Sequence, residues 1–115
     1  MKNNKAISER NYQFEQELCK AISKRVLIRL KYDTDTVERT FAPYGVYNSN
    51  TGKVLVCGIQ TDNPADPSEH DKPRNLEVGK IISISLTNIG FIPDDRFDPT
   101  DKKYRNGFIE RIDNH

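Results

Sequence analysis

The sequence predicts a mainly β fold, in which one N-terminal α-helix packs on a small antiparallel barrel. Two observations support this prediction. The apolar residues follow a helical period of 3.6 only near the N-terminus and switch to an alternating period of two at Val26. The alternating segments are short, and no second helical pattern separates them, as a parallel sheet would require.

The helical pattern covers residues 11–24. Its apolar residues share one face: Phe14, Leu18, Ala21 and Ile22. Lys24 and Arg25 follow at the C-terminal end, where positive charge suits the helix dipole. An amphipathic helix of this length is not stable alone in water, so it must cover an apolar surface.

That surface is predicted to be built from five short strands. Alternation marks residues 26–32, 37–47 with a break or bulge at Pro43, and 82–87, while 53–60 is apolar on both faces and 74–78 is a short strand. Turn-like sequences occupy 33–36 and 48–52. Residues 61–73 contain three prolines and no large apolar side chain, which predicts an exposed loop.

The length of 115 residues fits one domain. We expect residues 1–10 to form a flexible N-terminus, 11–93 the helix and barrel, and 94–115 a charged C-terminal arm. Phe97, Tyr104 and Phe108 could pin this arm to the body, and residues 108–112 fit either a short helix or an edge strand.

Charge and cysteine content narrow the class of protein. Eighteen Lys and Arg balance seventeen Asp and Glu, so the net charge of +1 excludes a strong overall electrostatic grip on nucleic acid or membrane but allows a local basic patch. No apolar run could span a membrane, and the N-terminus lacks a secretory pattern, so we expect a cytoplasmic protein.

Cys19 and Cys57 lie in apolar patterns and are expected to be reduced, buried thiols.

Residues 18–86, about three fifths of the chain, resemble the WYL-domain family. The matching elements are Ala21-Ile22, then Ile28, Leu30 and Tyr32, then Arg39, Phe41 and Pro43, then Gly52-Lys53-Val54-Leu55, and finally Arg74, Leu76, Val78, Lys80 and Ile81. Of the naming Trp-Tyr-Leu triplet only Leu55 is present, and Glu77 stands where the family has Arg. The resemblance implies a helix followed by an SH3-like or Sm-like barrel, as found in bacterial regulators and defence-associated proteins. The family usually carries a helix-turn-helix domain ahead of this one. The residues before Phe14 are too few for such a domain, so we expect a stand-alone version.

Arg39 is the most informative single residue. Alternation places it on the same face as Val37 and Phe41, and a charge on an apolar face must find a partner. One interpretation is a structural ion pair with an acid such as Glu77, or a stem that reaches the barrel rim. The other is a fork that binds a phosphate or carboxylate.

Four further residues complete the predicted ligand site. Arg74 occupies a basic position of the family, Lys80 lies close by, Lys53 lies in the triplet region, and Tyr44 could stack on a base or ring. Solvated charge and ordinary packing are the alternatives. A second basic set could follow a phosphate backbone or form a solvated face: Lys24, Arg25, Arg29, Lys31, Lys102, Lys103 and Arg105.

Catalytic and metal-binding patterns are weak. His70 has no second His or Cys at ligand spacing, and the acids at 94–101 do not follow the calcium-loop pattern. There is no Gly-rich phosphate loop and no serine nucleophile motif. We therefore expect no enzyme, no metal and no cofactor.

The resulting hypothesis is a WYL-like sensing or regulatory accessory domain, tied to transcription regulation, that binds an anionic ligand such as a nucleotide or nucleic-acid end. The alternative is a protein–protein assembly module whose strands pair with a partner or with copies of the chain. An Sm-like RNA-binding module is an intermediate hypothesis between these two.

Overall fold

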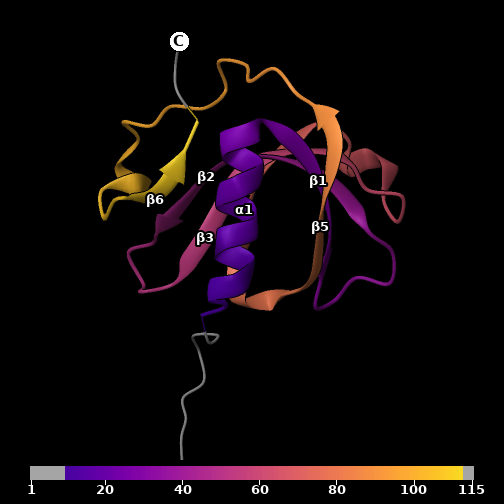
Figure 1. Ribbon diagram of the computed structural model, residues 1–115, viewed down its shortest axis with the longest axis horizontal. Coiled ribbons are helices and arrows are strands. Elements are labelled where there is room, and N and C mark those ends of the chain that lie inside the picture. Colours follow the sequence, from indigo (N-terminus) through magenta and orange to yellow (C-terminus); the bar gives the residue numbers. More distant parts are fainter. Residues whose placement is uncertain (1–9, 113–115) are drawn as a thin grey trace, which may run out of the picture.

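The computed structural model describes residues 10–112 (Figure 1). Its elements are α1 (Tyr12–Lys24), β1 (Val26–Tyr32), β2 (Arg39–Asn48), β3 (Val54–Asp62), β4 (Lys72–Glu77), β5 (Ile81–Gly90) and β6 (Phe108–Arg111), with 3-10 turns η1 (Pro67–Glu69), η2 (Val78–Lys80) and η3 (Lys102–Tyr104). The prediction of a mainly β fold with one N-terminal helix is confirmed. Residues 1–9, and with them most of the expected flexible N-terminus, lie outside the described part.

The strands form one antiparallel sheet. Their order is β4-β3-β2-β1-β5, and β6 pairs with the second half of β2. The outer strands β4 and β5 do not pair with each other, so the sheet is open and the predicted closed barrel is not confirmed. A side chain of β1 nevertheless contacts the outer edge of β4: the Tyr32 hydroxyl accepts a hydrogen bond of 3.0 Å from the backbone N–H of Glu77.

Local signals set both ends of α1. The Asn11 side chain caps the N-terminus by accepting a 3.0 Å hydrogen bond from the Phe14 N–H. Arg25 ends the helix in the left-handed conformation, at φ 55°, and its N–H reaches the carbonyls of Ala21 and Ile22. Figure 1 shows α1 lying across the sheet, and its apolar stripe is buried there.

The core lies between α1 and the sheet. Ile28, Phe41, Val46 and Val56 from neighbouring strands are fully buried, and burial of each such side chain stabilises the fold by about 1.5–3 kcal/mol. Gly58 is needed here because a Cβ atom would lie 2.1 Å from the Ala42 carbonyl oxygen. Strands β2 and β3 therefore approach each other too closely for any side chain at this position.

The predicted loop is shorter than expected. β3 extends to Asp62 and β4 begins at Lys72, so the connecting segment covers only residues 63–71 and includes η1. The ladder pairs Ile59 with Pro73, and a proline is tolerated there because β4 is an outer strand. The composition predicted a loop because prolines usually end strands. The register shift after Pro43 confirms the predicted bulge in β2.

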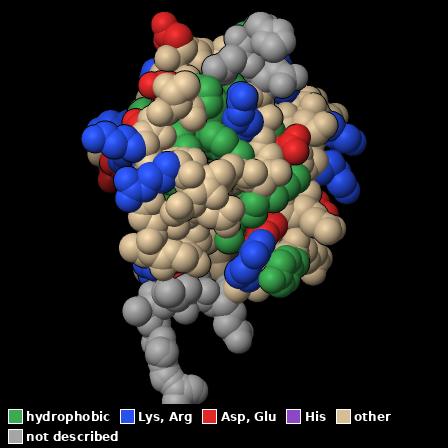
Figure 2. Space-filling model, turned by 90° about the vertical axis from the view of Figure 1, so that its left-hand side faces the viewer, with side chains coloured by type: hydrophobic (Ala, Val, Ile, Leu, Met, Phe, Trp, Pro, Cys, Tyr) green, Lys and Arg blue, Asp and Glu red, His purple; other side chains and the backbone are tan. Residues whose placement is uncertain are grey.

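The C-terminal segment returns to the sheet. Its aromatic rings pack with Tyr47 of β2 and with each other: Phe97, Tyr104 and Phe108. Of the two alternatives for residues 108–112, the structure has the edge strand, β6. Figure 2 shows the side of the molecule where this segment lies, with apolar side chains among basic and acidic ones.

Two further expectations concern cysteines and membranes. Cys19 and Cys57 are both free thiols. Cys57 is buried as expected, whereas Cys19 is only partly buried, and burial raises the pKa of each. Within residues 10–112, no helix has the length and apolar character needed to cross a membrane.

Candidate anion-binding site

Arg39, at the start of β2, is held in an ion pair inside the protein. Its Nε and Nη2 donate to the two carboxylate oxygens of Asp35 at 2.8 and 2.6 Å, and its Nη1 donates to Gln60 Oε1 at 2.8 Å. The guanidinium also lies over the Tyr32 ring, 5.8 Å from its centre. Only 13% of the Arg39 side chain is exposed.

This geometry matches the structural alternative for Arg39, with a different acid. The partner is Asp35, in the turn between β1 and β2, rather than Glu77. Burial acts to raise the pKa of Asp35, but hydrogen bonds from Arg39 and the Tyr32 N–H outweigh it and hold the pKa below its ordinary value of 3.8. The Asp35 carboxylate therefore already occupies the fork that an anionic ligand would need.

Arg74, on β4, has a more open environment. It pairs with Glu69 through Nε and Nη2, and its Nη1 donates to its own neighbour's carbonyl, Pro73 O, at 2.9 Å. About a third of its side chain is exposed. Gln60 connects the surroundings of Arg39 and Arg74. Its Oε1 accepts a hydrogen bond from Arg39, and its Nε2 donates to the backbone carbonyl of Glu69, the partner of Arg74. The two arginines are thus linked through Gln60, but they pair with different acids.

The other predicted ligand residues fall into two groups. Lys53 and Lys80 flank the buried carboxylate of Glu77, with N–O distances of 3.5 and 4.0 Å. Tyr44 belongs elsewhere: its hydroxyl accepts a 3.1 Å hydrogen bond from the Asp94 N–H, and its ring stacks on Phe91 at 5.7 Å.

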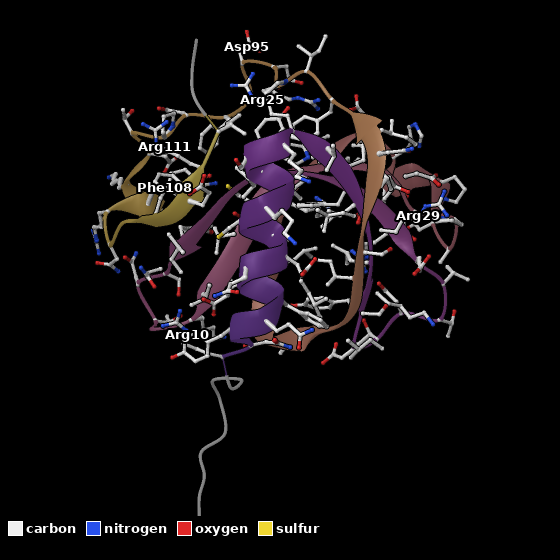
Figure 3. The ribbon with its side chains drawn as sticks, in the orientation of Figure 1. Arg10, Arg25, Arg29, Asp95, Phe108 and Arg111 are labelled. Atoms are coloured by element: carbon white, nitrogen blue, oxygen red, sulfur yellow. The ribbon has the colours of Figure 1, made fainter. Side chains whose placement is uncertain are left out.

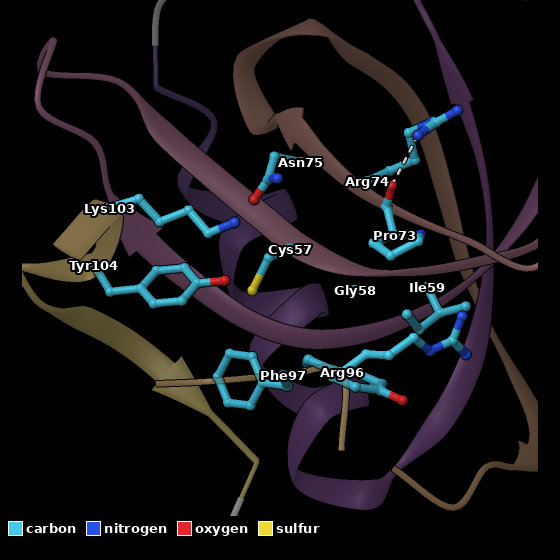
Figure 4. Close-up of a pocket in the computed structure, with 11 residues that line it drawn as sticks. Cys57, Gly58, Ile59, Pro73, Arg74, Asn75, Arg96, Phe97, Lys103 and Tyr104 are labelled. Carbon is cyan, nitrogen blue, oxygen red and sulfur yellow. Dashed lines mark hydrogen bonds between the residues drawn. The ribbon is translucent and has the colours of Figure 1, made fainter. Parts of the chain in front are cut away.

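A small hollow lies between strands β3 and β4 and the C-terminal segment (Figure 4). Its volume is about 50 Å³. Eleven residues line it: Tyr44, Cys57, Gly58, Ile59, Pro73, Arg74, Asn75, Arg96, Phe97, Lys103 and Tyr104. Of the five predicted ligand residues, the hollow brings together Arg74 and Tyr44 and leaves out Arg39, Lys53 and Lys80.

Three basic side chains border this hollow, and no lining residue is acidic. Arg96 pairs with Asp94 and Asp71, at 2.6 and 3.2 Å, but neither carboxylate belongs to the lining. Lys103 makes no ion pair within residues 10–112, and its ammonium lies 5.4 Å from the centre of the Tyr104 ring. Lys103 is thus the lining cation with no carboxylate partner in the described part of the chain.

Two polar groups at the base of the hollow are kept uncharged. Burial raises the pKa of the Cys57 thiol, although a hydrogen bond from Tyr104 and the nearby Lys103 ammonium oppose the effect. Burial also raises the pKa of the Tyr104 hydroxyl, and its contact with Cys57 raises it further. At neutral pH the hollow therefore presents neutral polar groups and positive charge.

Sequence reasoning missed Arg96 as a site residue and placed Lys103 in the second basic set. That set is not gathered on one face: Figure 3 shows Arg29 on β1, on the opposite side of α1 from β6, and Lys102 and Lys103 belong to η3, which directly precedes β6 in the chain. Among the described residues, no three His, Cys, Asp or Glu side chains are grouped to hold a metal ion.

Comparisons with known proteins find a likeness only at the level of structure. No family model and no curated protein matches the sequence. Among solved structures, proteasome accessory factor B/C (PafBC) of Arthrobacter aurescens is similar with a TM-score of 0.57 and 20% sequence identity. The match covers 75% of this chain and 13% of that one. At this identity the likeness shows the fold alone.

Proposed function

We propose that this chain is a WYL-like regulatory accessory domain that binds a terminal phosphate group in the hollow between β4 and the C-terminal segment, and that it acts by binding rather than by catalysis. The observation that carries the proposal is the bordering of one hollow by Arg74, Arg96 and Lys103, with the paired carboxylates outside the lining. The solved structure that shares the fold is itself named an accessory factor.

The size of the hollow supports a phosphate rather than a whole nucleotide. Its volume is about 50 Å³, whereas pockets that enclose drug-sized molecules measure roughly 300–1,000 Å³. A terminal phosphate could enter while the rest of the ligand stays outside. Such a phosphate occurs both on a free nucleotide and on the end of a nucleic-acid strand, so both ligand sources remain in the proposal.

The chemistry of the lining suits this group. Arg74 donates three hydrogen bonds, one each from Nε, Nη1 and Nη2, so two of its five N–H groups are left for a ligand. Lys103 adds a charge with no competing carboxylate in the described chain. Charge-assisted hydrogen bonds to phosphate contribute about 1.5–3 kcal/mol each.

The test compares Lys103→Ala with the matched control Lys102→Ala. Both lysines are exposed residues of η3, but only Lys103 lines the hollow. The probes are adenosine monophosphate, a short 5′-phosphorylated DNA strand and the same strand without the phosphate, measured by calorimetry and thermal shift. We expect Lys103→Ala to weaken binding of the phosphorylated probes by roughly ten- to a hundredfold and Lys102→Ala to leave it unchanged.

The three probes also separate the alternatives. Binding of adenosine monophosphate identifies a free nucleotide, whereas binding of the phosphorylated strand alone identifies a nucleic-acid end. Equal binding of both strands would favour the Sm-like nucleic-acid module and contradict a terminal-phosphate site. Equal losses in the two lysine variants would show that the contribution is general surface charge.

A further inference from the structure

The two outer strands of the sheet differ in how well they are protected. β5 runs for ten residues, Ile81–Gly90, and contains no charged residue and no proline. It pairs with β1 on one side and ends the strand order on the other. Natural outer strands are usually kept from pairing by charges, prolines or short length. The outer edge of β5 has none of these protections. Bulges can also protect an edge, but the two register shifts of β5 against β1 lie near its ends and leave residues 83–86 in regular pairing.

β4 is protected. It is six residues long and includes Lys72, Pro73 and Arg74. The ladder alternates, and Pro73 has no N–H to give β3, so residues 73, 75 and 77 direct their backbone nitrogens outward. Pro73 offers no donor, and the Glu77 N–H already bonds to the Tyr32 hydroxyl. Only Asn75 is left to offer an outward N–H, so β4 is a poor template for another strand.

Large apolar side chains are exposed along β5. Ile82 and Ile89 are 57% and 52% exposed, near the two ends of the strand. Between them Ile84 and Leu86 are only partly buried, although they face the core residues Leu30 and Ile28 across the ladder. A strand placed beside β5 would cover these side chains and pair the outward backbone groups.

We propose that two copies of this chain pair through the outer edges of β5, antiparallel and about a two-fold axis. Charge favours a second copy as the occupant. An uncharged strand can lie beside itself without placing like charges opposite each other. Antiparallel pairing also brings the start of one β5, which follows Lys80, towards the end of the other, which precedes Asp94 and Asp95 in the sequence.

The variant that tests this pairing is Ser85→Glu. Ser85 is exposed near the middle of β5, and within one copy it lies opposite Arg29, so a glutamate there gains a favourable cross-strand partner and the fold is kept. Across the two-fold axis the same change places two glutamates close together. The matched control is Ala65→Glu, which adds the same charge on the exposed segment between β3 and β4.

The measurement is sedimentation equilibrium over a wide range of protein concentration, with circular dichroism to check folding. We expect a concentration-dependent dimer for the parent and for Ala65→Glu, and a dissociation constant at least tenfold higher for Ser85→Glu. Amide hydrogen exchange of the parent should slow in β5, and not in β4, as concentration rises. A parent that stays monomeric, a larger ring, or a dimer indifferent to Ser85→Glu would overturn the proposal. Because no residue of β5 lines the hollow, phosphate binding by Ser85→Glu should be unchanged, which separates this test from that of the function.

Discussion

Replacing Arg39 by alanine distinguishes a structural arginine from a ligand-binding one. The change removes three hydrogen bonds of 2.6–2.8 Å and the charge opposite Asp35. The Asp35 side chain is 14% exposed, and Gln60 is fully buried. The variant therefore leaves a mostly buried Asp35 carboxylate that still accepts a hydrogen bond from the Tyr32 N–H, and it leaves Gln60 Oε1 without the Arg39 donor.

The size of the effect follows from this burial. Removing one partner of a buried ion pair costs about 3–5 kcal/mol. Some water can reach Asp35, so we expect the free energy of unfolding to fall by about 2–4 kcal/mol, which corresponds to a decrease in melting temperature of roughly 8–15 °C for a domain of this size. Urea denaturation should show a lower midpoint with an unchanged slope.

Two further variants sharpen the interpretation. In Arg39→Ala/Asp35→Ala the stranded carboxylate is gone, so the double variant should be more stable than Arg39→Ala alone. Arg74→Ala breaks a partly exposed pair and should cost less than about 1 kcal/mol of stability while weakening phosphate binding. If Arg39→Ala kept its stability and lost phosphate binding, the site would include Arg39 and the structural account would be refuted.

Three other outcomes follow from the same contacts. The folded pKa of Asp35 lies below 3.8, so its pairing stabilises the fold at higher pH, and this contribution is lost as pH falls through the folded pKa. Asp35→Asn should therefore lower the free energy of unfolding at pH 7. In acid titrations followed by circular dichroism, the stability of this variant should fall less steeply with decreasing pH than that of the parent. Glu69→Ala should release the Arg74 guanidinium and strengthen adenosine monophosphate binding in calorimetry, with a stability change under about 1 kcal/mol; weaker binding would count against the site. Gly58→Ala should destabilise the fold by about 3 kcal/mol or more in urea, since the new methyl group would collide with the Ala42 carbonyl oxygen; a stable variant would contradict the close strand approach.

Periodicity predicted most of the fold because it reports which face of an element is buried. The helix, the strands and the absence of parallel pairing all follow from that information. Alternation also placed Arg39 correctly on an inward face, but it did not identify the acid that Arg39 meets. Asp35 comes from the turn four residues earlier, and the hairpin folds it back onto the strand start. A charged pair at that spacing across a turn is the signal that could have identified the partner.

The site could not be predicted in the same way, because one of its two walls is a regular strand and the other is a segment with little regular secondary structure. One wall is a strand, β4, whose position follows from the ladder. The other is the segment that carries Arg96 and Lys103, most of which has no regular period. Its aromatic residues indicate that it packs on the body but not where. Contacts seen only in the structure, such as that of Tyr104 with Tyr47, place Lys103 across the hollow from Arg74. A bound phosphate would therefore bridge the sheet and the C-terminal segment, so ligand binding would stabilise the docked position of that segment. This coupling gives a regulatory domain a physical means of converting ligand binding into a change at its surface.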